Sequence, residues 1–266
     1  MRTSLFALLL LIAWPAHATQ DMILNLPVRG TQMRIYVAQA ALPVQGVVIL
    51  MAGGSGRLDI GETGRIARLG GNQLVRTRGG YAAAGFIAAV TDVPDDFKEG
   101  AEGVRNSYRW SAEHAADIGV LVDAMRRLHP KVYLVGTSRG ALSVANAAAR
   151  LSGTQKPDAI VITSGMLMDQ GRNQPSVQRM VKPLEAITMP VLLMAHENDA
   201  CLYTPARATP QFKALLTAAP QVGIMMLKGG QIDKKGEECE AAGHHGFAGL
   251  DQEVVAAVTG WLKGLN

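Results

Sequence analysis

The stretch Gly136-Thr137-Ser138-Arg139-Gly140 decides how this chain folds. It follows an apolar run, residues 131–135, and precedes an alanine-rich helical pattern that ends near residue 151. A turn that leads directly from a strand into a helix forces strained backbone at its centre, and flanking glycines let the two elements approach closely. The pattern predicts that the Ser138 hydroxyl stands clear of a sheet, at the carboxyl end of a strand, where open α/β sheets place their sites.

The spacing Gly-x-Ser-x-Gly is weak evidence when taken alone. A chain of this length and composition would contain it by chance about one time in ten. A glycine-rich turn without chemistry is therefore the alternative interpretation. The strand before the motif and the helix after it exclude most chance matches and favour a functional serine.

On both sides of this turn, short β-branched runs alternate with longer amphipathic stretches. This alternation is typical of an α/β protein with a mostly parallel sheet and helices on both faces. Continuous apolar runs indicate strands that are buried on both sides. The expected strands are residues 33–37, 47–51, 86–91, 132–135, 159–163, 191–195 and 223–227, and the expected helices are residues 73–84, 111–128, 140–151, 206–218 and 252–262.

The composition is that of a globular protein with a sizeable core: 48% of the 266 residues are hydrophobic and 18% are charged. No repeat, low-complexity tract or Pro/Ser-rich linker interrupts the chain after residue 20, so residues 19–266 predict a single domain. The 26 basic residues are scattered and only slightly outnumber the 22 acidic ones. This balance does not indicate a nucleic-acid partner.

The first residues have the form of a signal peptide. Arg2 supplies a positive end, residues 5–12 form an apolar run, and Ala16-His17-Ala18 has the small-x-small form of a cleavage site. A membrane anchor is the alternative, but the apolar run is too short to cross ~30 Å of hydrocarbon. We therefore expect residues 1–18 to be removed from an exported, periplasmic or secreted protein without stable membrane insertion.

A serine hydroxyl becomes an effective nucleophile when a base lies within hydrogen-bond reach and a carboxylate orients that base. The expected strand 191–195 leads into a loop that carries Asp199 at the same sheet edge as Ser138. Asp199 is the first candidate acid and Glu197 the alternative, while a surface carboxylate without a role is the third interpretation.

The candidate base comes from the pair His244 and His245, in a glycine-flanked loop before the last expected helix. The other four of the six histidines lie in the leader, in or at the end of a helical pattern, or beside the candidate acid. Adjacent histidines could also bind a metal, but no further Cys/His/Asp cluster at metal spacing supports a zinc site. The sequence predicts neither a metal nor an organic cofactor.

The chain order Ser138, Asp199, His245 is that of the α/β-hydrolases. Over nearly all of residues 33–266 the chain resembles the α/β-hydrolase superfamily, and the dienelactone-hydrolase-like serine esterases are nearest because they share the His-Gly-Phe type of ending found at residues 245–247. The resemblance implies an α/β-hydrolase fold and hydrolysis through an acyl-enzyme. It also favours His245 over His244 as the base.

Acyl transfer also requires N–H donors that face the oxygen on which negative charge develops. In this fold one donor is the amide after the nucleophile, here Arg139, and the second comes from the loop after an early strand, where Gly54 is the candidate. Ala52 stands where many family members carry a histidine, so the resemblance does not extend to that position. A phosphate-binding loop is the competing interpretation, but no Gly-Lys-Ser/Thr follows.

The two cysteines of the chain, Cys201 and Cys239, are expected to form a disulfide. If Asp199 and His245 meet, the loops that carry the cysteines converge, and disulfides persist in exported proteins. Two unpaired buried thiols are the alternative.

Residues 164–189 are too short for a large cap domain, and Met166, Leu167 and Met168 could line an acyl pocket or pack beneath the loop. The sequence therefore predicts a serine hydrolase that cleaves small carboxylic esters. A peptidase or amidase of the same fold, or a non-catalytic binding protein that keeps the fold, are the alternatives.

Overall fold

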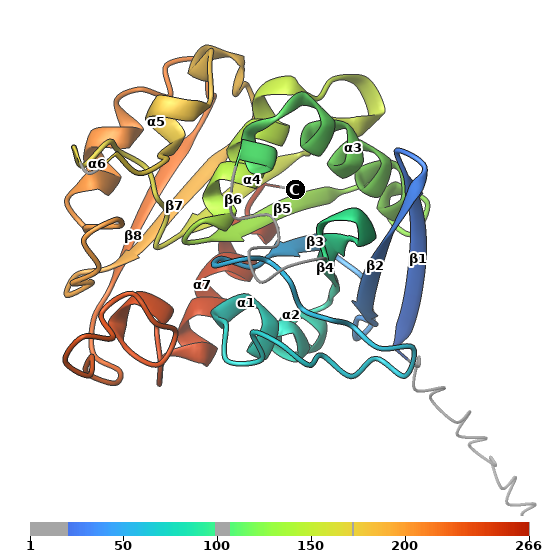
Figure 1. Ribbon diagram of the computed structural model, residues 1–266, viewed down its shortest axis with the longest axis horizontal. Helices are drawn as coiled ribbons and strands as arrows, with labels where there is room; N and C mark the ends of the chain where they lie inside the picture. The colour runs from blue at the N-terminus through green and yellow to red at the C-terminus, as the bar shows by residue number, and fades with distance from the viewer. Residues whose placement is uncertain (1–20, 99–106, 172, 266) are drawn as a thin grey trace, which may run out of the picture.

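One sheet of eight strands runs through residues 21–98, 107–171 and 173–265, which this computed structural model describes (Figure 1). The predicted signal peptide, residues 1–18, lies outside the described residues. The strand order is β1-β2-β4-β3-β5-β6-β7-β8. The strands are β1 (Met22–Val28), β2 (Thr31–Ala38), β3 (Gly46–Met51), β4 (Phe86–Pro94), β5 (Val132–Thr137), β6 (Ala159–Thr163), β7 (Val191–His196) and β8 (Val222–Leu227).

The sheet is mostly parallel, as predicted. Strands β4, β3, β5, β6, β7 and β8 pair in parallel, whereas β1 with β2 and β2 with β4 are antiparallel. Every residue of β3, β5, β6 and β7 is buried. Burial on both faces explains why these strands read as continuous apolar runs in the sequence.

Strand β1 was not among the expected strands. Asn25 and Pro27 interrupt its apolar pattern, and proline is tolerated there because β1 lies at the edge of the sheet. Arg29 and Gly30 join β1 to β2 with φ angles of 46° and 80°, the left-handed backbone that a tight hairpin turn requires.

Helices cover both faces of the sheet, as predicted. Buried side chains of α3, α4, α5 and α6 share one apolar core with one sheet face, and those of α1, α2 and α7 share a second core with the other face. Figure 1 shows α1, α2 and α7 below the sheet and the other helices above it. Among the described residues no helix is both long and apolar enough to cross a membrane. The helices are α1 (Gln73–Arg76), α2 (Arg78–Ala83), α3 (Ala112–Arg126), α4 (Gly140–Arg150), α5 (Val177–Met180), α6 (Ala208–Lys213) and α7 (Asp251–Lys263).

Two expected helices differ from the observed ones. The helix expected at residues 73–84 is interrupted at Thr77, whose hydroxyl donates to the Gln73 carbonyl oxygen at 2.7 Å. The helix expected at residues 206–218 ends as α6 at Lys213. The following N–H groups, of Leu215 and Leu216, bond to carbonyls three residues back and so tighten the chain into 3₁₀ turns.

The segment between β6 and β7 contains no large cap domain in its described residues, 164–171 and 173–190. It holds α5, which is four residues long, and a 3₁₀ turn at Leu184–Ala186. The carboxyl ends of the strands are therefore not covered by a separate domain within this segment.

The turn between β5 and α4 has the strained backbone that the motif predicts. Ser138 has a φ of 53°, in the left-handed region that L-residues rarely adopt. A Cβ atom on Gly136 would lie 2.6 Å from the Gly140 carbonyl oxygen, and one on Gly140 would lie 2.2 Å from the Met51 carbonyl oxygen. Without side chains at these two positions, α4 begins directly against the ends of β5 and β3.

We predict that Gly140→Ala lowers the free energy of unfolding by about 2–4 kcal/mol, because the methyl group would collide with backbone that cannot move without disturbing β3. Gly260→Ala is the matched control, since a Cβ atom there meets nothing within 4 Å on helix α7. Alanine at this control position should raise the free energy of unfolding by roughly 0.5–1 kcal/mol. Chemical denaturation followed by circular dichroism measures both changes, and equal stability of the two variants would contradict the packing argument.

Candidate active site

Ser138 lines a cleft at the carboxyl edge of the sheet. Its backbone N–H donates to the Thr163 carbonyl at 3.0 Å, and its carbonyl accepts from the N–H groups of Ala141 and Met166. These bonds tie the turn to β6 and α4. The cleft has a volume of about 220 Å³, and Ser138, Arg139 and His245 are among the residues that line it.

Asp199 and His245 meet directly, although they are 46 positions apart in the chain. The Oδ2 atom of Asp199 lies 3.0 Å from Nδ1 of His245, and both residues are buried. The other carboxylate oxygen, Oδ1, accepts from the N–H of Cys201 at 3.0 Å. A carboxylate beside Nδ1 favours the tautomer with a proton on Nδ1 and leaves Nε2 as an acceptor.

Thr204 is a member of this cluster that the sequence did not reveal. Its hydroxyl lies 3.0 Å from Oδ2 of Asp199, to which it donates, and 3.0 Å from Nδ1 of His245. A threonine five residues after an aspartate carries no recognisable signal. Its contact with the histidine arises only when the two loops converge.

The two alternative candidates have other partners. Glu197 forms an ion pair with Lys228 at 3.0 Å, and its side chain is 37% exposed. The Nδ1 atom of His244 lies 3.3 Å from Asp233, and its ring stacks on His196 with 4.3 Å between ring centroids. The structure thus brings Asp199 together with His245, whereas Glu197 and His244 make separate contacts.

His196 anchors the loop that leads to Asp199. Its Nδ1 accepts from the N–H of Asn198 at 3.1 Å, so its Nε2 is the donor to the Gly229 carbonyl at 2.8 Å. The imidazole therefore joins the end of β7 to the chain after β8.

Arg76, on α1, holds the loop that carries His245. Its Nη2 donates to the Gly246 carbonyl at 2.6 Å and its Nη1 to the Ala241 carbonyl at 3.2 Å. Its Nε donates to Asp251 at 2.9 Å, which extends the contact to the start of α7. A single guanidinium thus fixes the backbone on both sides of His245.

The predicted disulfide between Cys201 and Cys239 is present, with 4.6 Å between the two Cα atoms. It joins the loop after β7 to the loop between β8 and α7, and both cysteines line the cleft. The bond therefore holds the backbone of the Asp199 loop close to the backbone that precedes His245.

The glycine loop after β3 forms another wall of the cleft. Gly53 lies directly against the serine, since a Cβ atom on Gly53 would be 2.9 Å from the Ser138 Cβ and 3.4 Å from its Oγ. The N–H of Gly56 donates to the Gly53 carbonyl at 3.0 Å, and Gly54 has a φ of 56°. The structure brings Gly54 and Arg139, the predicted N–H donors, to the same cleft.

The remaining cleft lining combines apolar and polar side chains. Met166 lines the cleft, whereas Leu167 is buried in the core and Met168 packs against that core. Of the two interpretations of these residues, Met166 has the position expected of a pocket-lining residue, and Leu167 and Met168 have the apolar packing that was the alternative. Polar lining residues that the sequence did not single out are Asn72, Gln73, Tyr203 and Glu240.

One group of potential metal ligands occurs in the described ranges, and two of its three members line this cleft. Single atoms of Asp199, Cys201 and His245 lie within 4.8 Å of one another. The sulfur of Cys201 is bonded to Cys239, so it offers no thiolate. Asp199 and His245 are hydrogen bonded to each other, and three metal ligands are therefore not assembled here.

Comparisons with known proteins identify the architecture. No protein-family model and no curated protein matches the chain. Among solved structures, the dienelactone hydrolase from Anabaena variabilis has a TM-score of 0.64 at 14% identity, covering 92% of this chain and 97% of the other. A soluble variant of monoglyceride lipase from Saccharomyces cerevisiae has a TM-score of 0.65 at 12% identity, covering 95% of this chain and 97% of the other. The carboxylesterase CesB from Bacillus subtilis has a TM-score of 0.56 at 15% identity, covering 93% of each chain.

These structures match the chain over almost its full length and over almost the full length of their own chains. Their low sequence identities make the likeness one of architecture. The parallel sheet, the helices on its two faces and the glycine-flanked turn at Ser138 agree with that architecture. The chain therefore has the α/β-hydrolase fold.

Proposed function

We propose that the protein is a serine hydrolase that cleaves carboxylic esters of small molecules. The observation that carries this proposal is the buried Asp199–His245 pair, at 3.0 Å, whose histidine lines the same cleft as a serine held at a φ of 53°. Acyl transfer requires a nucleophile and a base that face one cleft, together with an acid that orients the base. A protein that only binds its ligand has no need of this set.

In the proposed reaction, Ser138 Oγ attacks the ester carbonyl carbon while Nε2 of His245 takes the hydroxyl proton. The tetrahedral intermediate then collapses, the ester C–O bond breaks, and the imidazolium returns the proton to the leaving alcohol. Water repeats the sequence on the acyl-enzyme and releases the carboxylic acid. No external oxidant or reductant enters this cycle.

Asp199 and Thr204 support the base in this scheme. The Asp199 carboxylate keeps the Nδ1 proton in place and stabilises the imidazolium that forms during attack. Because Thr204 and the N–H of Cys201 also donate to this carboxylate, its orientation is fixed before the substrate binds. The amides of Arg139 and the Gly54 loop are the proposed donors to the oxyanion.

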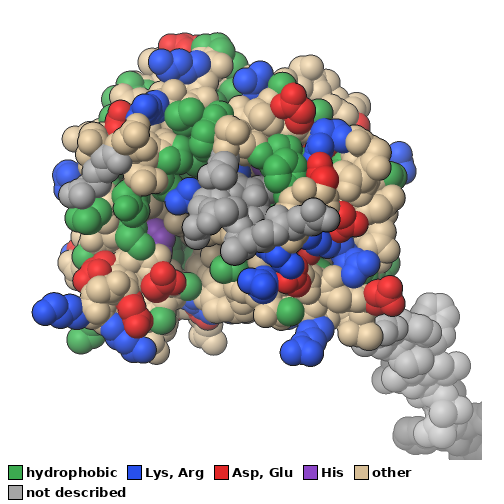
Figure 2. All heavy atoms as spheres, viewed as in Figure 1, with side chains coloured by type: hydrophobic (Ala, Val, Ile, Leu, Met, Phe, Trp, Pro, Cys, Tyr) green, Lys and Arg blue, Asp and Glu red, His purple; other side chains and the backbone are tan. Residues whose placement is uncertain are grey.

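Three observations support an ester of a small molecule as the substrate. The structures of similar fold include a lipase and a carboxylesterase. The cleft, at about 220 Å³, is smaller than the clefts that hold drug-sized ligands, and this size favours a small substrate. On the face shown in Figure 2, basic and acidic side chains are interspersed, which suits a small ligand better than a polyanion.

Export is part of this proposal. The signal-peptide pattern of residues 1–18 and the Cys201–Cys239 disulfide both favour a periplasmic or secreted location, where disulfides persist. N-terminal sequencing of the protein recovered outside the cytoplasm would test the cleavage site after Ala18.

We predict that Ser138→Ala abolishes covalent labelling by a fluorophosphonate and lowers ester turnover by roughly 10⁴–10⁶-fold. His245→Ala should be nearly as damaging, because the serine loses its base. His244→Ala is the matched control and should be mild, since His244 contacts His196 and Asp233 instead. Undiminished labelling of Ser138→Ala, or a severe loss confined to His244→Ala, would contradict the assignment.

We predict that Asp199→Asn leaves the fold intact and lowers turnover by roughly 10⁴-fold, because the amide favours the wrong imidazole tautomer. Glu197→Gln is the control at the same loop and should have little effect, since its exposed partner is Lys228. Steady-state kinetics on a chromogenic ester measures both variants. If Asp199→Asn kept its turnover while Glu197→Gln lost it, Glu197 rather than Asp199 would be the acid.

Reduction of the Cys201–Cys239 bond should lower both stability and turnover. The bond closes a loop with a sequence separation of 38. For a loop of this length the chain-entropy model gives a stabilisation of the folded state of about 4 kcal/mol. Cys239 is exposed, so a small thiol reductant can reach the bond. Turnover should fall at temperatures where circular dichroism shows a folded protein, because the Asp199 loop loosens. The double variant Cys201→Ser, Cys239→Ser should match the reduced protein and be insensitive to the reductant.

A further inference from the structure

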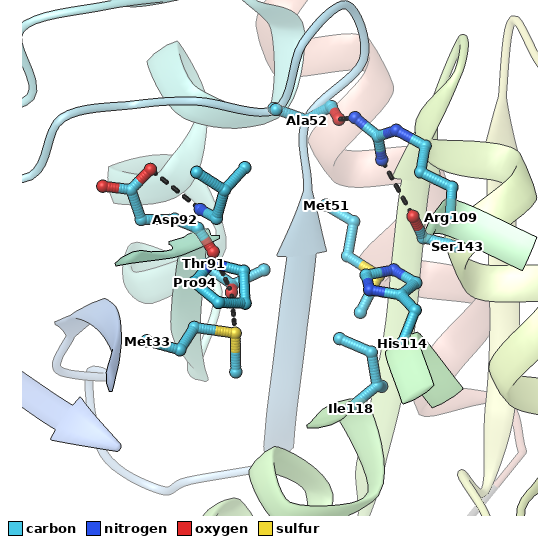
Figure 3. A pocket seen from close by; sticks show the side chains of 12 residues that line it. Met33, Met51, Ala52, Thr91, Asp92, Pro94, Arg109, His114, Ile118 and Ser143 are labelled. Carbon is cyan, nitrogen blue, oxygen red and sulfur yellow. Dashed lines mark hydrogen bonds between the residues drawn. The ribbon is translucent and has the colours of Figure 1, made fainter. Parts of the chain in front are cut away.

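Arg109 is a buried cation whose partners among residues 21–98, 107–171 and 173–265 are all neutral. It belongs to a 3₁₀ turn at Ser107–Trp110, before α3, and is 2% exposed. Its Nη1 donates to the Ser143 hydroxyl at 2.8 Å, and its Nη2 donates to the carbonyls of Ala52 at 3.0 Å and Gly54 at 3.3 Å. Figure 3 shows the guanidinium extending from its own backbone toward Ala52 and Ser143.

Within the described ranges no carboxylate forms an ion pair with Arg109, and its Nε has no hydrogen-bond partner. Burial, together with the positive charge of Arg139, lowers the pKa of Arg109 to about 9, so the guanidinium keeps its charge at neutral pH. Buried charges are normally paired, because removing them from water is costly. An unpaired one beside a candidate active site calls for a functional explanation.

The carbonyls that Arg109 holds belong to the glycine loop beside the serine. The Ala52 carbonyl shares a planar peptide unit with the N–H of Gly53, and the Gly54 carbonyl shares one with the N–H of Ser55. These two peptide units flank the unit that carries the Gly54 N–H, so fixing both oxygens constrains that unit from both sides. The third partner, Ser143, is on α4, the helix that begins directly after the Ser138 turn.

We propose that Arg109 is a positioning residue for the oxyanion site: its guanidinium locks the glycine loop against α4 and places a positive charge, which has no acidic partner among the described residues, near the proposed N–H donors. This inference rests on the proposed hydrolase function. Arg109 acts through the loop and does not itself touch the substrate.

Two physical effects would result from this arrangement. The two restrained peptide units hold the Gly54 N–H in one orientation between them, so this donor need not reorganise when the oxyanion forms. In a site with a low dielectric constant, preorganised charge of this kind acts mainly on the transition state, where the oxyanion forms. His114 lies beside Arg109 on a small shared cavity and adds no second charge, because burial lowers its pKa to about 3.

The decisive variant is Arg109→Lys, which keeps the charge but cannot span three acceptors in one plane. With p-nitrophenyl acetate as substrate, kcat and kcat/KM should fall together by roughly 10–100-fold while KM stays within about twofold. The affinity for phenylboronic acid, which forms a tetrahedral adduct with an active serine, should fall by a similar factor. A role confined to folding would change the unfolding midpoint without this kinetic signature.

Arg126→Lys is the matched control. Arg126 also binds backbone carbonyls, those of Pro130, Thr154 and Lys156, but it lies at the end of α3 near the start of β5, at the opposite edge of the sheet. This variant should lose stability and keep kcat. Ser143→Ala is a second probe that leaves the loop untouched, and it should reduce kcat by a few fold in a folded protein even if Arg109→Lys fails to fold.

The outcomes separate this inference from the function on which it rests. A wild-type protein that fluorophosphonate does not label would overturn the proposed function, and the inference with it. A labelled wild-type protein would leave the function standing. In that case an unchanged kcat in Arg109→Lys, or in Ser143→Ala if the lysine variant does not fold, would overturn the positioning role alone, as would a loss expressed only in KM.

Discussion

Helix α4 can begin against the end of β3 because Gly140 has no side chain: a Cβ atom there would lie 2.2 Å from the Met51 carbonyl oxygen. This contact determines where Ser138 stands, since the serine occupies the left-handed turn between β5 and α4. It also brings the loop that follows β3 to the serine, so that Gly53 packs directly on its side chain. The candidate site is therefore built around one close backbone contact, and the other loops are arranged around it.

Parallel strands bring the remaining parts to this point. Because β3, β5, β6 and β7 run in the same direction, the loops at their carboxyl ends meet at one edge of the sheet. The loops that carry Asp199 and His245 have little regular structure of their own, and other bonds hold them. The Cys201–Cys239 disulfide joins the two loops, and Arg76 binds the backbone on both sides of His245. A site on loops needs such support if its geometry is to be defined before substrate binds.

The two buried charged side chains of the site, Asp199 and Arg109, have different kinds of hydrogen-bond partners. Asp199 accepts hydrogen bonds from a backbone N–H, from Thr204 and from His245. Arg109, by contrast, contacts carbonyl and hydroxyl oxygens and has no acidic partner in the described residues. In the proposed reaction the histidine becomes positive as the substrate oxygen becomes negative. The fixed negative charge lies next to the histidine and the fixed positive charge next to the glycine loop, which is the arrangement that favours such charge separation.

The sequence by itself determined the features that depend on local backbone and on burial. Buried parallel strands must be apolar throughout, and a strand-to-helix turn at a serine needs flanking glycines, so both could be predicted from residue order. The Cys201–Cys239 pairing also followed, once Asp199 and His245 were expected to meet. Strand β1 was missed because an edge strand tolerates Pro27, and the break at Thr77 depends on one side-chain hydrogen bond. Only the tertiary structure placed Thr204 on the Asp199–His245 pair and Arg109 on the glycine loop. These contacts join residues 41 and 57 positions apart through polar side chains of common types, and no periodicity or spacing in a sequence records which distant carbonyl or imidazole such a side chain will reach.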